Sequence, residues 1–191
     1  MPGRFTTTLA ALACLVYIVP GWSEQWVYER AASGEWWRFL TASLVHYDLW
    51  HLITNLAAFL VLGTAFERIR PRWEWVLLTF SIVFTTILFV HYALPSYGAF
   101  AGISCVNYGF LGYGLCYLSR KHRVEPWGAL LLIGLYSVAV AVLQDPSANL
   151  PRPVWQVHTL AFGLGWLQAW TALRRWGRRP VPRSASMPEL A

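Results

Sequence analysis

The chain has 191 residues, of which 57% are apolar and 16% aromatic, whereas only 13% are charged. The charged share is about half of the roughly 25% that is usual in soluble globular domains, and the mean hydropathy is +0.42. This composition excludes a disordered chain, a coiled coil and an ordinary soluble enzyme. The formal net charge is +6, and a basic balance occurs in proteins that bind nucleic acid or membranes. The hydrophobicity favours the membrane, and no nucleic-acid partner is expected.

A membrane-spanning helix needs about 20 mostly apolar residues, and six stretches of the chain are candidates. They are residues 6–22, 47–66, 75–94, 102–119, 127–143 and 154–173. The first is short and contains Pro20, so a retained helix and a cleaved signal peptide are both considered for it. No clear small-x-small cleavage site follows it, which favours the retained helix. We predict an all-α polytopic membrane protein with six transmembrane helices.

Basic residues are distributed unequally between alternate loops of such a bundle. Twelve Lys and Arg side chains fall on one side and three on the other. Because cytoplasmic loops are enriched in Lys and Arg, both termini are predicted to be cytoplasmic. Residues 1–174 then form the membrane domain. Residues 175–191, rich in Arg, Pro and Ser, form a basic cytoplasmic tail that is solvated or touches lipid headgroups.

Polar side chains inside membrane spans are costly and point to functional sites. In the predicted orientation the second, fourth and sixth spans all run inward from the outer face. His51, Ser104 and His158 each lie near the outer end of their own span. Asn55 follows His51 by four residues and shares its helical face. A hydroxyl, an amide and two imidazoles are thus predicted at one depth in the outer half of the membrane.

This set of side chains suits acyl transfer. Serine is a weak nucleophile that needs a neighbouring base, and His158 is the better candidate for the base of Ser104. His51 and Asn55 form an i, i+4 pair that is suited to another task, donating hydrogen bonds to a developing oxyanion. The backbone N–H of Ser104, at the start of a helix, is a third donor.

Two further residues are predicted to support the site. Gly102 lets the loop bring Ser104 close, and Tyr108 is placed to pack flat on the His158 ring, a task that an acid performs in three-residue triads. Each polar residue alone has a simpler explanation, because Ser usually bonds its own helix and His or Asn usually joins helices. The shared depth favours catalysis over packing alone. No role for Asn107 follows from the sequence.

These motifs resemble those of the rhomboid intramembrane serine proteases over nearly the whole chain. The matching motifs are Glu35-Trp36-Trp37-Arg38-Phe39-Leu40-Thr41, His46-x4-His51-x3-Asn55, Gly63-x3-Glu67, Gly102-Ile103-Ser104 with Tyr108 and Gly112, and His158 with Gly165. The resemblance implies that Ser104 and His158 form a catalytic dyad and that His51, Asn55 and backbone N–H groups form the oxyanion hole. It also implies a serine endopeptidase that cleaves membrane-anchored proteins near the outer leaflet of a bacterial inner membrane.

Two positions depart from the family pattern. Cys105 stands where a glycine follows the nucleophile, and Ala161 stands where the family has the glycine of its A-H-x-x-G motif. Both substitutions are expected to shift the geometry of the dyad and lower the rate, since catalysis is sensitive to placement. They support the alternative function, a protease-dead relative that binds membrane clients.

The same residues also bear on the branch of the family and on other functional classes. The compact form and the run from Tyr28 to Arg38 are similar to the rhombosortase branch, bacterial relatives that process C-terminal Gly-Gly anchors; a general-purpose rhomboid is the alternative. A transporter is disfavoured because no span carries a charged residue at its middle. A metalloprotease is disfavoured because there is no HExxH motif. No metal and no cofactor are expected.

Overall fold

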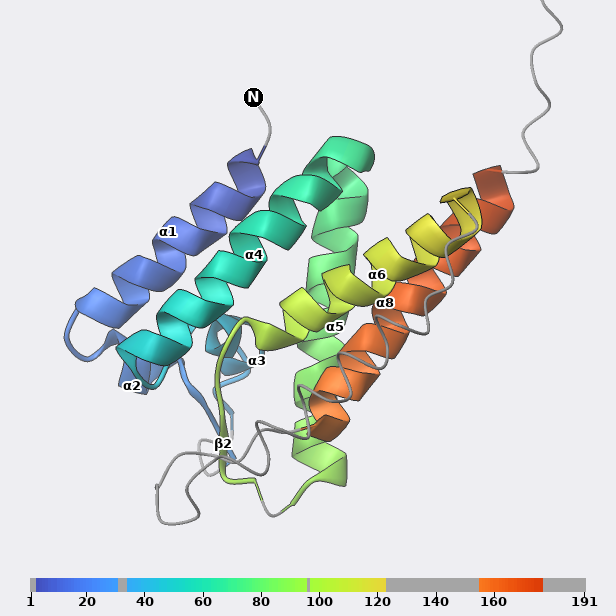
Figure 1. Cartoon of the computed structure of the whole chain (residues 1–191). Coiled ribbons are helices and arrows are strands. Elements are labelled where there is room, and N and C mark those ends of the chain that lie inside the picture. Colours follow the sequence, from blue (N-terminus) through green and yellow to red (C-terminus); the bar gives the residue numbers. More distant parts are fainter. Residues whose placement is uncertain (1–2, 31–33, 96, 123–154, 177–191) are drawn as a thin grey trace, which may run out of the picture.

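The computed structural model describes residues 3–30, 34–95, 97–122 and 155–176. These residues are mostly helical, as the sequence predicts (Figure 1). The expected fifth span, residues 127–143, lies outside the described residues, and so does nearly all of the basic tail. The six spans and the orientation of the bundle in the membrane stay predictions.

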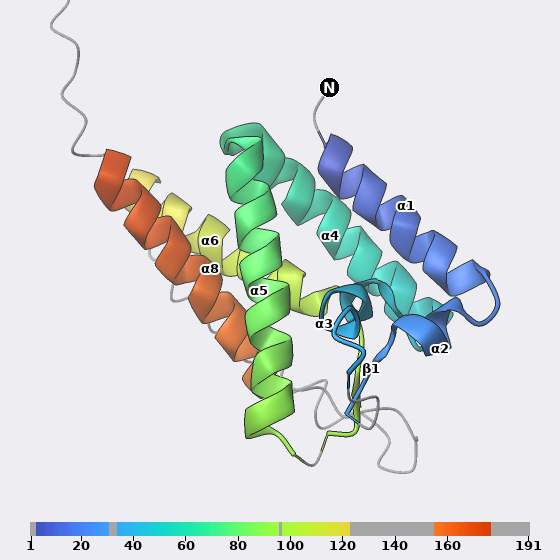
Figure 2. The same ribbon diagram turned by 180° about the vertical axis from the view of Figure 1, so that it is seen from behind.

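Long helices make up the described bundle. They are α1 (Arg4–Ile18), α4 (Leu49–Ile69), α5 (Arg72–Ala93), α6 (Ser104–His122) and α8 (Trp155–Trp176). Figures 1 and 2 show that α4, α6 and α8 run in one direction, whereas α1 and α5 run in the other. The N-terminal ends of α4, α6 and α8 therefore lie at the same end of the bundle, the lower end in Figure 1.

The described helices differ in their fit to a membrane. α4 and α5 are long and apolar enough to cross one, whereas α6 and α8 have the length but are less apolar. α1 has 15 residues and is shorter than the expected span over residues 6–22. It ends at Ile18 because Val19 precedes Pro20 and takes an extended conformation, φ −84° and ψ 119°, which a following proline favours.

The segment between α1 and α4 folds into short elements. They are α2 (Trp22–Trp26), β1 (Tyr28–Glu29), α3 (Arg38–Thr41) and the 3-10 helix η1 (Ala42–Leu44). The Arg38 guanidinium holds them together, since it pairs with Glu35 and donates to the backbone carbonyls of Glu24 and Val27, both at 2.8 Å. β1 pairs antiparallel with β2 (Ala99–Phe100), just before α6. The segment is thereby attached to the loop that leads into α6.

Charged side chains satisfy the backbone at two helix ends. The Glu67 carboxylate accepts from the backbone N–H of Thr6 at 2.6 Å, which places a negative charge at the start of α1. Gly63 permits this approach, because a Cβ there would lie 2.7 Å from Thr6 Oγ1. At the end of α5, Arg30 donates to the Val90 carbonyl at 2.7 Å. Carbonyls in the last turn of a helix have no partner within it, so this contact stabilises the end of α5.

The helices α6 and α8 approach each other at backbone distance. A Cβ on Gly165 would lie 1.9 Å from the carbonyl oxygen of Gly109, and a Cβ on Gly112 would lie 2.2 Å from that of Phe162. Small residues let membrane helices approach this closely, and here any side chain larger than hydrogen would strike backbone. The glycines therefore fix how near α8 comes to α6.

The core of the bundle is aromatic. Its large members, all 3% exposed or less, are Phe59, Phe66, Trp75, Phe110 and Tyr113. The Phe66 ring stacks on Phe110 with centroids 5.1 Å apart and meets the edge of Tyr113 at 4.6 Å. The Trp75 ring on α5 lies 5.7 Å from that of Phe110, so the core joins α4, α5 and α6. The helix that begins at Ser104 is thus fixed on both sides, by this core and by α8.

Candidate active site

Ser104 and His158 lie close together, as the sequence predicts. Ser104 is the first residue of α6, and His158 is in the first turn of α8. Ser104 Oγ and His158 Nε2 are 2.9 Å apart, within hydrogen-bond distance. The close packing at Gly165 and Gly112 brings the two helices near enough for this short hydroxyl to reach the ring. A hydroxyl bonded to a histidine nitrogen is the arrangement that activates serine.

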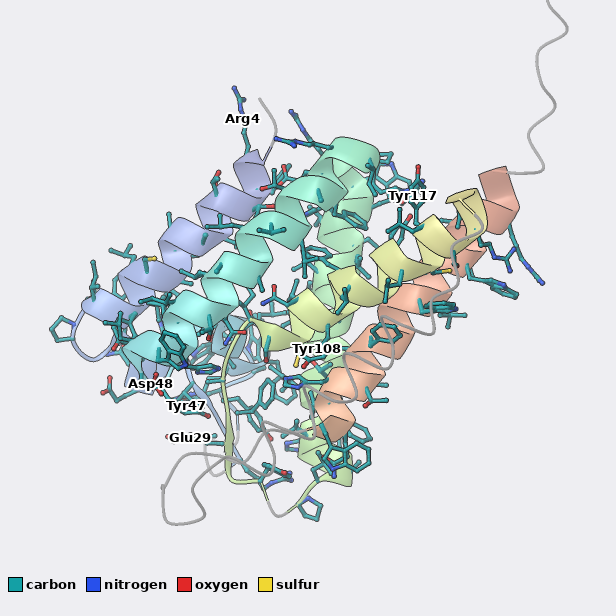
Figure 3. The ribbon with its side chains drawn as sticks, in the orientation of Figure 1. Arg4, Glu29, Tyr47, Asp48, Tyr108 and Tyr117 are labelled. Atoms are coloured by element: carbon teal, nitrogen blue, oxygen red, sulfur yellow. The ribbon has the colours of Figure 1, made fainter. Side chains whose placement is uncertain are left out.

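The Tyr108 ring covers one face of the His158 ring. The ring centroids are 4.3 Å apart, and the planes meet at 10°. Figure 3 shows Tyr108 on α6 where that helix passes α8. A ring held flat against tyrosine cannot swing its Nε2 away from Ser104 without losing this contact. The structure thus places Tyr108 where the sequence predicted it.

His51 lies beside the loop that carries the serine. Asp48 precedes α4, and its carboxylate accepts from the His51 backbone N–H at 2.7 Å (Asp48 is labelled in Figure 3). This N-cap fixes the first turn of the helix. The imidazole packs on Gly102, because a Cβ there would lie 3.1 Å from His51 Nε2 and 3.9 Å from Ser104 Oγ. Gly102 has φ +114°, a conformation that glycine adopts without strain.

The side-chain amide of Asn55 bonds the backbone of its own helix, α4. Its Nδ2 donates to the His51 carbonyl at 2.9 Å, and no hydrogen bond joins its side chain to Ser104 or His158 among the described residues. One N–H of the amide remains for another acceptor. The structure therefore places Asn55 one turn after His51, on the side of α4 that contacts α6.

The loop before Ser104 is held by the segment that precedes α4. The backbone N–H of Gly102 donates to the Ala42 carbonyl at 3.0 Å, and β1 and β2 pair two residues earlier. Ile103, next to the serine, is 1% exposed. Three attachments over a few residues leave little freedom for the position of the serine hydroxyl.

The two departures from the family pattern are buried. Cys105 is 2% exposed, and its thiol lies beside the Thr86 hydroxyl on α5. Ala161 is fully buried on α8. Neither prevents the hydrogen bond between Ser104 and His158. The thiol also lies beside the Ser104 side chain, but among the described residues it is the Ser104 hydroxyl that bonds His158.

His46 is a buried histidine outside the helices. Its side chain contacts His51, with ring centroids 5.0 Å apart, and its Nδ1 lies 3.2 Å from the Leu44 carbonyl oxygen. Burial, and then the neighbouring His51, lower the pKa of His46 to about 4. Its ring is therefore uncharged at neutral pH. Within the described parts of the chain, no group of three or more His, Cys, Asp or Glu side chains is placed to hold a metal ion.

Sequence reasoning missed two residues of this region. Asp48 caps the helix that carries His51, and its position just before an apolar stretch was the signal for it. Asn107 is 6% exposed, and its Nδ2 donates to the backbone carbonyl of Asn55 at 3.0 Å. Nothing in the spacing of the sequence indicates this second contact, because it joins residues of two different helices.

Comparisons with known proteins agree with the motifs. Residues 33–175 match the Rhomboid domain. The chain is 28% identical over 145 residues to rhomboid protease GlpG of Haemophilus influenzae. The aligned stretch covers 70% of this chain and 74% of that protein. It is 36% identical over 94 residues to rhomboid protease GluP of Bacillus subtilis, covering 48% of this chain and 18% of the relative.

A third relative is rhomboid protease GlpG of Enterobacter sp., which is 28% identical over 147 residues, covering 72% of this chain and 51% of that protein. The chain thus spans only half of this relative and a fifth of GluP, while it spans most of the Haemophilus protein. The match to the Rhomboid domain includes the residues from which the site is built. The chain belongs to the rhomboid family of intramembrane serine proteases.

Proposed function

We propose that the chain hydrolyses peptide bonds in membrane-anchored proteins, with Ser104 as nucleophile and His158 as general base. The observation that carries this proposal is the 2.9 Å contact between Ser104 Oγ and His158 Nε2. It lies at the end of the bundle where α4, α6 and α8 begin. With its proton on Nδ1, the His158 ring accepts the serine proton at Nε2.

The reaction proceeds in two halves. Ser104 Oγ forms a bond to the scissile carbonyl carbon while His158 takes the hydroxyl proton. His158 then gives that proton to the leaving amine as the carbon–nitrogen bond breaks. Water repeats the sequence on the acyl-enzyme and restores the serine. Tyr108 acts throughout as a positioning residue, since its stacked ring keeps His158 Nε2 facing Ser104.

The negative charge that develops on the carbonyl oxygen requires hydrogen-bond donors. His51, the free N–H of the Asn55 amide and the backbone N–H of Ser104 supply them in this proposal. His51 and Ser104 both lie against Gly102, so an oxygen bonded between them is close to the attacking serine. The N-terminus of α6 adds the favourable end of its dipole.

The unequal distribution of Lys and Arg between the loops supports a location for the cleaved bond. With both termini cytoplasmic, the starts of α4, α6 and α8 face outward, so the bond that is cut lies near the outer leaflet. The basic tail after residue 174 then touches the cytoplasmic leaflet of a bacterial inner membrane. Substrates are transmembrane segments or C-terminal anchors that unwind locally at this depth.

A narrower substrate class follows from the run between Tyr28 and Arg38. Its similarity to the rhombosortase branch supports processing of proteins with a C-terminal Gly-Gly motif, an anchor helix and a basic tail. In this structure the run begins with β1, which pairs with β2 just before the serine, and it ends at Arg38, which donates to the Glu24 and Val27 carbonyls. A change of substrate class through this loop needs no change in the dyad.

The experiment is co-expression with two substrates, one carrying a Gly-Gly anchor and one a generic single transmembrane segment. Wild type is compared with Ser104→Ala and His158→Ala. Ser119→Ala is the matched control, since Ser119 is on the same helix and its hydroxyl donates to the Cys116 carbonyl of that helix at 3.0 Å. Cleavage by wild type and the control but by neither dyad variant is the expected result.

Each outcome has a distinct meaning. Cleavage of the Gly-Gly substrate alone supports the rhombosortase class, and cleavage of the generic substrate supports a general rhomboid. Full cleavage by Ser104→Ala overturns the assigned nucleophile. If neither substrate is cut, labelling of wild type by a fluorophosphonate decides between an enzyme with other substrates and a protease-dead client binder.

A further inference from the structure

Asn107 joins the helix of the serine to the helix of the expected oxyanion hole. It lies three residues after Ser104 on α6 and is 6% exposed. Its Nδ2 is 3.0 Å from the Asn55 backbone oxygen and 3.5 Å from the Asn55 side-chain oxygen. An amide buried between membrane helices is costly unless its groups are bonded. Its own oxygen has no hydrogen-bond partner among the described residues.

The polarity of the Asn107 amide is fixed by what it faces. A backbone carbonyl only accepts hydrogen bonds, so the side chain must turn its NH₂ group, and not its oxygen, to the Asn55 carbonyl. The reversed amide would set two oxygens 3.0 Å apart. The Asn107 side chain therefore turns its N–H donors, and not its oxygen, toward α4.

The polarity of the Asn55 amide follows in turn. Its oxygen faces the Asn107 donor, and its NH₂ group faces the His51 carbonyl at 2.9 Å. A reversed Asn55 would place donor against donor at Asn107 and oxygen against oxygen at His51. Both neighbours thus hold Asn55 with its N–H donors on the side of His51, which itself lies against the loop of Ser104.

We propose that Asn107 is a positioning residue for the oxyanion hole, which keeps the Asn55 amide turned so that its N–H is available to the developing negative charge. The role depends on Ser104 acting as the nucleophile proposed above. It predicts an effect on the transition state and not on the dyad, because the Asn107 side chain bonds Asn55 on α4, whereas His158 is held by Ser104 and Tyr108.

The test uses a fluorophosphonate probe on the full chain in liposomes, so no natural substrate is required. Ser104 Oγ forms a bond to phosphorus, fluoride leaves, and His158 takes the hydroxyl proton; the phosphonyl oxygen carries the developing charge. Asn107→Leu has nearly the shape of Asn but no donor, and Asn107→Val is a smaller second variant that cannot overfill the site. Ser119→Ala is the control.

Asn107→Leu is expected to lower the maximal labelling rate about tenfold. Asn55→Ala, which removes an oxyanion donor outright, is expected to lower it about a hundredfold. Probe affinity, the pH dependence of labelling and the melting temperature stay as in wild type. In the Asn55→Ala background, Asn107→Leu has no further effect, because the amide that it orients is gone.

Three results overturn the proposal for Asn107 and leave the proposed function intact. The first is wild-type labelling by both Asn107 variants. The second is a lower melting temperature with an unchanged maximal rate, which assigns Asn107 to helix packing alone. The third is a shifted pH dependence, since that result places the effect on His158. Absence of labelling in wild type overturns the proposed function of Ser104 and the role of Asn107 with it.

Discussion

The rings of Tyr108 and His158 lie almost parallel, 4.3 Å apart, although they belong to helices whose residues are distant in the sequence. The contact uses a full aromatic face to orient the imidazole, in place of the carboxylate of a three-residue triad. Among the residues that the structure describes, no ion pair involves Ser104 or His158, which suits a site within the membrane.

Removal of the Tyr108 ring should therefore act through the orientation of His158. We expect Tyr108→Leu to lower the rate of fluorophosphonate labelling about tenfold, because small displacements of a catalytic base are costly. Tyr108→Phe keeps the stacked ring and should retain most of the rate. Labelling by Tyr108→Leu at the wild-type rate would show that the stack does not position the base.

The glycine contacts between α6 and α8 predict a sharp difference between neighbouring positions. Gly165→Ala should destabilise the fold by about 1–3 kcal/mol, because its Cβ meets backbone that cannot move aside. At Gly114 on α6 and Gly163 on α8 a Cβ would find nothing within 4 Å. Alanine there should be neutral or stabilise by about 0.5–1 kcal/mol.

Thermal unfolding of the three alanine variants in detergent measures this difference. Labelling of Ser104 should fall only in Gly165→Ala, since separation of the helices lengthens the contact between the serine and His158. Equal melting temperatures for all three variants would mean that α6 and α8 are not in backbone contact.

The conformation of Gly102 predicts that alanine at this position lowers the cleavage rate more than it lowers the stability of the fold. Its φ of +114° disfavours any L side chain, and a Cβ would press on His51 at 3.1 Å. Gly102→Ala should cost about 1 kcal/mol in stability and reduce cleavage about tenfold or more, because it moves both His51 and the serine loop. Gly98→Ala, where a Cβ would meet nothing within 4 Å, is the matched control.

The comparison requires the rate and the melting temperature of the same preparations. A loss of activity in Gly102→Ala that follows only its loss of folded protein would contradict the expected effect on the site. The same loss in Gly98→Ala would show that the loop tolerates no alanine anywhere.

His46 predicts a pH dependence of stability. Its pKa is lowered to about 4 in the folded chain, whereas an unperturbed histidine has a pKa of about 6.5. Between these values the unfolded chain binds a proton and the folded chain does not, so the free energy of unfolding falls as the pH drops below about 6.5. Above that pH the contribution is fully present. The loss between pH 7 and pH 5 is about 2 kcal/mol.

His46→Asn removes the titrating group, and its side-chain NH₂ stands where Nδ1 stood, so a donor for the Leu44 carbonyl is kept. Its melting temperature should decrease less than that of wild type between pH 7 and pH 5. Parallel decreases for the two proteins would place the acid sensitivity at other residues.

The sequence predicts the parts of this molecule that depend on periodicity and depth. The lengths of α4 and α5 follow from their apolar composition, and the nearness of Ser104 and His158 follows from spans that run in the same direction. The predicted first span extends beyond the end of α1, because the apolar run continues to residue 22 whereas Pro20 favours an extended conformation at Val19.

The remaining contacts join residues that no local pattern connects. Glu67 caps α1 from 61 residues away, Arg30 closes α5 from 60 residues away, and β1 pairs with a strand just before the serine. Asn107 is an example at the site, since the role of its polar side chain becomes visible only from its contact with Asn55 on another helix. Such contacts depend on how the helices pack, which composition alone does not determine.

The hydrogen bond between Ser104 and His158 spans 54 residues of sequence, and its second member belongs to the last described helix. In the proposed mechanism the ribosome therefore releases the nucleophile before the base. The Ser104 hydroxyl then has no base until α8 packs beside α6, so the proposed activity requires the last described helix to be in place.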